Sequence, residues 1–336
     1  MAGDTKKAFW EEKNTAFGSA APGLDLLHPE FREREPSPEL TETQYLGFNI
    51  PEQNIHGLCY LWHHPNLGVV TGGAWAWRGV KRHTLQCEIF DMLTYVDDAV
   101  LANDLHEVTL PNGYRTSVLE PLKRLRIGYA DADRGNAIDI EFEAMMDPMV
   151  LSSEMHFEQG MRTRGSVTFG GHEYPVDGYT VRDRSWGQVR REAHANVPPM
   201  AWMTCVFDDD LAFGTTAFDA EETNPDWRGV MKVPGGDPTR GGWVLRGGEL
   251  VPVVSTVKRT IRNATTRFPE AVELTITDAT GQRLEALGTI LAAANWRTWH
   301  NMDSIICLTR WECDGRIGHG DFQDVWFHDY VRQFLG

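Results

Sequence analysis

The residues best suited to chemistry in this 336-residue chain gather in one segment, DGYTVRDRSWGQVRRE, at residues 177–192. Here Asp183 stands between two arginines, and flanking guanidinium groups should lower its pKa unless burial raises it. The cluster is therefore either a structural set of ion pairs or a polar group that handles a proton beside a cavity. Because side chains alternate along a strand, one face would carry Arg182, Arg184 and Trp186, and the other Tyr179, Val181, Asp183 and Ser185.

A second candidate pair, His156 and Glu158, precedes this segment in the chain. Two residues apart on a strand, they would point to the same face with Cα atoms about 6.5–7 Å apart. Such a pair can pass protons, and the glutamate can tune the imidazole. The alternative is a solvated pair on an outer sheet face, which Phe157 favours if its own side is the buried one.

Aromatic residues supply candidates for a pocket wall. GAWAWRG, at residues 73–79, places Trp75 and Trp77 on one strand face. Large aromatic side chains line apolar pockets as well as cores, so a packed core is the competing interpretation.

The known motifs for other chemistry are absent from the sequence. It has no GxGxxG after a strand, no GxxxxGK[ST], no HExxH and no GxSxG. The adjacent pair His63 and His64 is a poor chelate, because neighbouring residues on a strand point to opposite faces. We therefore expect no metal site.

Composition excludes further classes of function. The chain has 32 Lys and Arg against 48 Asp and Glu, a net charge of −16, which argues against nucleic acid as a partner. No run approaches the roughly 20 apolar residues of a membrane helix. The N-terminus has no apolar signal region, and the five cysteines are scattered without CxxC. We expect a cytoplasmic protein with reduced thiols.

The sequence resembles the AttH-like, carotenoid 1,2-hydratase (hydroxyneurosporene synthase) superfamily. The resemblance rests on HFEQGMRTRGSVTFGG at 156–171 followed by GYTVRDRSWGQVR from residue 178. Members show a strand bearing His, Glu and Gln, a glycine-rich hairpin, and then G-x-x-x-R-D-x-S-W-G. The matching positions here are His156, Glu158, Gln159, Gly178, Arg182, Asp183, Ser185, Trp186 and Gly187.

This resemblance implies two lipocalin-like β domains with an apolar substrate cavity within or between them. It also implies chemistry without an organic cofactor, in which an acid protonates an alkene or polarises a carbonyl. Members hydrate, cyclise or only bind their ligands, so the resemblance does not select one reaction, and fold alone does not carry function.

The residue patterns independently favour an all-β protein. IDIEFEAMM at 138–146 and AVELTITD at 271–278 alternate apolar and polar residues, as half-buried strands do. Asn112-Gly113 and Asp314-Gly315 predict tight hairpins, and glycine pairs such as Gly170-Gly171 mark further turns. Helix is expected only at residues 91–105 and 324–335. We predict a peripheral segment at residues 1–45, and two lipocalin-like barrel or sandwich domains at 46–193 and 194–336.

Together with the resemblance, these observations predict a cofactor-independent acid–base lyase that acts on a hydrophobic isoprenoid or aromatic molecule in a β-barrel cavity. The reaction would be hydration, dehydration or a related C–C or C–O elimination. Asp183 is the first candidate acid, with the pair His156 and Glu158 next. Arg182 and Arg184 would orient Asp183 or stabilise negative charge. Trp186, Trp75, Trp77, Tyr179 and Gln159 would contact the substrate. A cyclase or isomerase, a non-catalytic carrier and a homodimer all remain open.

Overall fold

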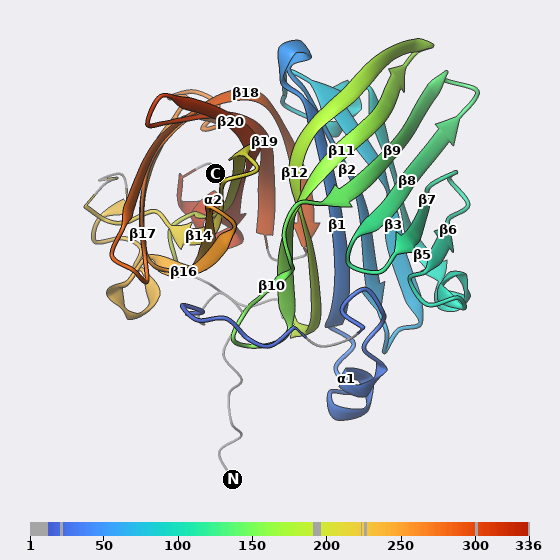
Figure 1. Ribbon diagram of the computed structural model, residues 1–336, viewed down its shortest axis with the longest axis horizontal. Coiled ribbons are helices and arrows are strands. Elements are labelled where there is room, and N and C mark those ends of the chain that lie inside the picture. Colours follow the sequence, from blue (N-terminus) through green and yellow to red (C-terminus); the bar gives the residue numbers. More distant parts are fainter. Residues whose placement is uncertain are drawn as a thin grey trace.

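The computed structural model describes residues 13–20, 23–190, 196–222, 224, 227–299 and 302–334. Within these ranges the strands form two large sheets that pack side by side. Figure 1 shows a closed barrel, drawn in yellow to red, beside a curled open sheet in blue and green. The expected all-β fold with two domains is confirmed.

The curled sheet contains the first half of the chain, and its strands run in the order β5-β3-β2-β1-β12-β11-β9-β8-β7-β6, with β10 beside β11. All the pairings within it are antiparallel. Its strands are β1 (Leu40–Ile50), β2 (Ile55–His64), β3 (Val69–Arg78), β5 (Ile89–Asp97), β6 (Glu107–Thr109), β7 (Arg115–Glu120), β8 (Arg124–Asp131), β9 (Asn136–Ala144), β10 (Met149–Val150), β11 (His156–Phe169) and β12 (His172–Val189).

The barrel is closed by the pairing of β17 with β18, and the short strand β4 (Val80–Lys81) joins β18 in parallel from the other half of the chain. Closure leaves no free edge among the barrel strands. They are β13 (Met200–Asp208), β14 (Leu211–Phe218), β15 (Thr239–Arg246), β16 (Glu249–Arg262), β17 (Pro269–Asp278), β18 (Arg283–Trp299), β19 (Met302–Cys313) and β20 (Arg316–Phe327).

Local sequence explains most of these strands. In β9, Ile138, Ile140 and Phe142 are buried, while the intervening acidic residues are wholly or partly exposed. The loop Asp314-Gly315 joins β19 to β20 with both residues at positive φ, 49° and 78°, as a type I′ turn requires. The alternation and the hairpin were both predicted correctly.

The helices in the described ranges are short: α1 (Pro29–Arg34), α2 (His328–Phe334), and the 3₁₀ turns η2 (Pro51–Gln53), η3 (Thr84–Gln86), η4 (Asp98–Leu101) and η6 (Pro234–Gly236). The helix predicted at residues 91–105 is wrong. Residues up to Asp97 form β5, because they pair with β3, and Tyr95 has a φ of 58°, which an α-helix does not accommodate. The C-terminal helix exists but begins only at His328, after β20.

The N-terminal segment differs from its expected peripheral role. The boundary predicted at residues 45/46 falls inside β1, a strand whose residues are all buried. Asp25, earlier still, is buried against β12 through Arg182. The other predicted boundary, at residues 193/194, lies outside the described residues.

Three of the apolar clusters show how the molecule is packed. One fills the concave side of the curled sheet, and a second fills the barrel. The third lies between the two sheets, where Leu58 and Trp75 pack against Ala292, Ile306 and Leu308 of the barrel. Both faces of the central strands β1 and β12 are therefore covered.

Candidate active site between the two sheets

A row of polar side chains crosses the face of the curled sheet that packs against the barrel. The strand registers place Glu158 of β11 opposite Asp183 of β12, Asp183 opposite Tyr45 of β1, and Tyr45 opposite Tyr60 of β2. Directly opposed residues in antiparallel strands lie about 4.5–5.5 Å apart, so these four groups are immediate neighbours. His156, two residues before Glu158, lies on the same face.

His156 is held at both ring nitrogens. Its Nδ1 lies 2.7 Å from Ser185 Oγ and its Nε2 lies 3.3 Å from Glu158 Oε1. Burial lowers the pKa of this imidazole. The hydrogen bond that its Nε2 donates to Glu158 and the negative charges of Asp183 and Glu158 outweigh burial and raise the pKa above its usual value.

Glu158 is fixed by two indole groups from the barrel. Trp202 Nε1 donates to Oε1 at 2.7 Å, and Trp243 Nε1 donates to Oε2 at 2.6 Å. Gly214 lies beside this pair, and a Cβ there would overlap both Glu158 Oε2 and the Trp243 indole nitrogen. The barrel thus positions a carboxylate that belongs to the other sheet.

Asp183 is the carboxyl group in this row whose chemistry is most altered. Burial raises its pKa to about 6, the charges of Glu158 and Asp321 act in the same direction, and His156 and Arg190 oppose them. Asp183 still keeps part of its surface accessible. An acid that is partly protonated near neutral pH, beside an imidazole held by two partners, can donate and accept protons.

The predicted role of Arg182 and Arg184 in orienting Asp183 is not what the geometry shows. Both side chains pass to the opposite, concave side of the sheet, as strand alternation requires. There Arg182 Nη1 lies 2.7 Å from Asp25 Oδ1, and Arg184 Nη2 lies 3.3 Å from Glu42 Oε2. These are buried structural ion pairs.

Gln159 and Trp186 also lie on this concave side. Gln159 Oε1 accepts from Arg182 at 2.7 and 2.9 Å, and the Trp186 ring stacks on His28 with centroids 4.2 Å apart. Neither residue lies on the face of the sheet that carries Asp183. The predicted substrate-binding residues are therefore divided between the two faces of the sheet.

The remaining predicted residues face the barrel. Trp75 and Trp77 are fully buried with ring centroids 4.3 Å apart, and Trp75 Nε1 donates to Cys87 Sγ at 3.1 Å. They form packed core beside the polar row. Tyr179 lies toward the rim of the joint, where its hydroxyl donates to Asp209 Oδ1 at 3.0 Å.

A family model described as "Domain of unknown function (DUF7064)" matches residues 28–327, a stretch that includes every residue of this site. The chain belongs to this family. A search of the curated proteins found no match.

Two solved structures share the fold of this DUF7064 protein. Kievitone hydratase from Nectria haematococca is 13% identical with a TM-score of 0.52, covering 96% of this chain and 98% of that chain. A protein described as an AttH from Nitrosomonas europaea is 15% identical with a TM-score of 0.54, covering 93% and 98%. The expected resemblance to AttH-like hydratases is confirmed at the level of fold.

The sequence did not point to several groups of the site, and they come from both sheets. Tyr45 lies in the segment that was interpreted as peripheral. Tyr60 lies in an apolar run, LCYLW, whose alternation would have placed it with Leu58 on one face. Arg190 ends the run GYTVRDRSWGQVR and was given no role there. The others depend on how the barrel packs against the curled sheet, and no local pattern marks them: Trp202, Trp243 and Asp321.

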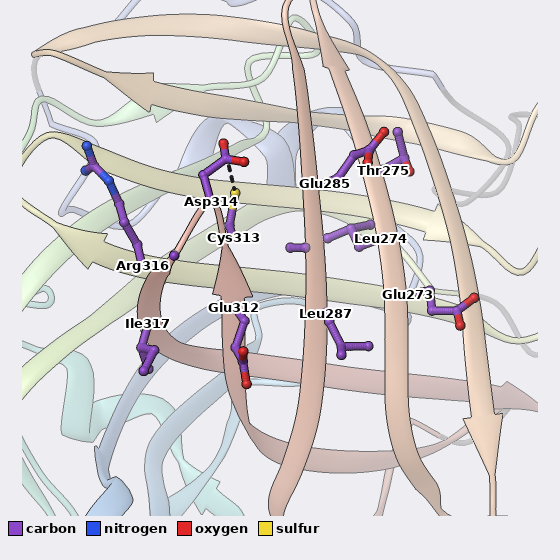
Figure 2. A pocket seen from close by; sticks show the side chains of 12 residues that line it. Glu273, Leu274, Thr275, Glu285, Leu287, Glu312, Cys313, Asp314, Arg316 and Ile317 are labelled. Atoms are coloured by element: carbon purple, nitrogen blue, oxygen red, sulfur yellow. Dashed lines mark hydrogen bonds between the residues drawn. The ribbon is translucent and has the colours of Figure 1, made fainter.

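A separate pocket of about 470 Å³ opens in the barrel wall, where the β19–β20 hairpin meets β17 and β18 (Figure 2). Its lining includes Glu273, Glu285, Glu312 and Cys313. Its lining residues include none of the residues of the polar row. Among the described residues no group of three or more His, Cys, Asp or Glu side chains could hold a metal ion, and no helix is long and apolar enough to cross a membrane.

Proposed function

We propose that this DUF7064 protein is an acid–base hydro-lyase that adds water to, or removes water from, a C=C bond of an apolar isoprenoid or aromatic molecule. The observation that carries the proposal is the pair Asp183 and His156 on adjacent strands. Asp183 has a pKa of about 6, and His156 is held by Ser185 and Glu158. The fold shared with a hydratase is consistent with this chemistry and does not by itself establish it.

The two groups suit opposite ends of one reaction. His156 and Asp183 are diagonal neighbours across β11 and β12, a relation that separates Cα atoms by about 7–8 Å. In hydration, protonated Asp183 gives its proton to one alkene carbon, and neutral His156 takes a proton from the water that attacks the other carbon. The substrate gains one water, and a proton returning from His156 to Asp183 restores the starting state.

Dehydration uses the same groups in reverse. The His156 imidazolium protonates the leaving hydroxyl, and the Asp183 carboxylate removes a proton from the neighbouring carbon. In both directions the pair holds one proton in total, so the raised pKa of each partner suits the task.

The surroundings also fit an apolar substrate. Tyr60 and Trp202, both partly accessible, stand beside the polar row, and the Tyr60 ring meets Trp296 at a centroid distance of 6.0 Å. Aromatic π faces stabilise a nearby cation, which protonation of an alkene would generate.

The test is turnover of a panel of isoprenoid and phenolic alkenes and alcohols in deuterium oxide or heavy-oxygen water, read by mass spectrometry. Variants Asp183→Asn and His156→Gln should each lower turnover about 10²- to 10⁴-fold. The matched control is Asp139→Asn, an exposed carboxyl paired with Arg126 on the curled sheet.

The isotopes separate the alternatives. Heavy oxygen in the product, lost in Asp183→Asn, supports hydration. Deuterium uptake without oxygen would replace it with an isomerase or cyclase that uses the same acid. Loss of one water from an alcohol, abolished in Asp183→Asn, supports dehydration. Binding with neither isotope uptake nor loss of water would refute catalysis and leave a carrier.

A further inference from the structure

A second buried carboxylate, Asp321 of the barrel, is held by two side chains of the curled sheet. Tyr45 Oη donates to Asp321 Oδ1 at 3.0 Å, and His56 Nε2 lies 2.7 Å from the same oxygen. On its own side, the Asp321 amide donates to Thr204 Oγ1 at 3.1 Å. All three side chains of this contact are almost completely buried.

His56 lies between two oxygen atoms. Its Nδ1 lies 3.1 Å from the carbonyl oxygen of Phe48, which can only accept, so Nδ1 carries a proton. Its Nε2 faces the Asp321 carboxyl, and the two groups form an ion pair when the imidazole is protonated. In that form Asp321 keeps a negative charge between the sheets.

Asp321 is connected to the proposed acid through Tyr45. In the strand register Tyr45 stands directly opposite Asp183, so its ring spans the distance from one acid to the other. Gly47, on the same face of β1, leaves room for this ring, since a Cβ there would crowd the Tyr45 hydroxyl. The charge of Asp321 acts on Asp183 in the direction that favours the protonated form.

We propose that Asp321, His56 and Tyr45 form a positioning set across the joint between the sheets, which keeps Asp183 in its proton-donating form only when the barrel is docked. The meaning of this set for catalysis rests on the proposed function. None of the three residues is required to touch the substrate. The titratable or charged groups that act on Asp183 from each packed element are His156 and Glu158 on β11, Arg190 after β12, Tyr45 on β1, Tyr60 on β2 and Asp321 on β20.

The experiment is a pH titration of the Asp183 carboxyl carbon by nuclear magnetic resonance, with ¹³C-labelled aspartate in the full-length protein. The signal is assigned by its absence from Asp183→Asn. In Asp321→Asn the titration midpoint of Asp183 should fall measurably toward the usual value for aspartate, because a like charge has been removed. Asp314→Asn is the control, an exposed position on the β19–β20 hairpin where asparagine suits the positive φ.

A second variant keeps the test decisive if Asp321→Asn does not fold. Tyr45→Phe retains the Asp321 charge and removes one of its hydrogen-bond donors, so the Asp183 midpoint should rise. If the positioning set acts on Asp183 through its charges, the two substitutions should shift the titration midpoint of Asp183 in opposite directions. Midpoints that stay within error of wild type in the variants that fold would overturn the proposal, because a purely structural contact moves neither.

This readout needs no substrate, so the two proposals fail separately. Shifted midpoints in a protein that converts no alkene would retain the positioning set and reject the reaction. Turnover that depends on Asp183, with midpoints unmoved, would retain the reaction and reject the positioning set.

Discussion

Replacing Asp183 by asparagine should stabilise the folded protein at neutral and alkaline pH. Burial raises the pKa of Asp183 from 3.8 to about 6, so the folded state binds this proton roughly 10²-fold more tightly than the unfolded chain. At about 1.4 kcal/mol for each factor of ten, ionised Asp183 lowers the free energy of unfolding by about 3 kcal/mol. This is a ceiling, because the side chain remains partly accessible.

The sign of the pH dependence follows from proton linkage. Between about pH 4 and pH 6 the native state holds the proton that the unfolded state has released, so the unfolding free energy of the wild type falls as pH rises. Asparagine does not titrate, and the advantage of the variant therefore grows across this window and stays constant above it. At acid pH, where Asp183 is protonated in both the native and the unfolded state, the advantage disappears.

The assay is urea unfolding of wild type, Asp183→Asn and the control Asp139→Asn from pH 4.5 to 8.5, followed by tryptophan fluorescence. The difference between Asp183→Asn and wild type should rise with pH by up to about 3 kcal/mol. Asp139→Asn should follow wild type within about 0.5 kcal/mol, because its carboxyl is exposed. If the difference is independent of pH or grows toward acid pH, burial does not disfavour the ionised form of Asp183.

Three further substitutions test the supports of the site. Trp243→Phe removes a donor to buried Glu158 and should lower the unfolding free energy by about 2 kcal/mol or more, measured by urea unfolding. Gly214→Ala forces a methyl group against the same contact and should cost about 1–3 kcal/mol, with a chemical-shift change at the Trp243 indole as the local readout. Asp25→Asn leaves Arg182 without its carboxylate and should cost about 3–5 kcal/mol; a loss below 1 kcal/mol would contradict a buried pair.

Much of the fold could be predicted because local sequence patterns determine many of its strands and turns. Alternation identified β9 and β17, and the turn Asp314-Gly315 identified its hairpin, since positive φ restricts the residues allowed there. The helix predicted at residues 91–105 failed because the backbone of residues 91–97 pairs with β3. Long-range pairing of this kind overrides local periodicity.

The site was predictable only in part, for a geometric reason. Strand alternation is enough to place Asp183 with Ser185, and His156 with Glu158. The same rule sends Arg182 away from Asp183, which contradicts its predicted role without any need for coordinates. No residue spacing, however, predicts that Asp321 or the barrel indoles lie near these groups, because they meet only where the two sheets pack against each other.

The arrangement of charges on β12 explains how Asp183 can hold a proton although its neighbours in the sequence are two arginines. If the guanidinium groups shared the face of Asp183, their charges would hold it ionised. Alternation instead carries them through the sheet to a covered face, where Asp25 neutralises Arg182 and Glu42, whose pKa burial raises to about 7, lies beside Arg184. A paired charge exerts a much weaker field than a free one, so the residues near the N-terminus protect the proton on Asp183 from the other side of the sheet. The concave face thus provides the electrostatic setting that the chemistry on the barrel side requires.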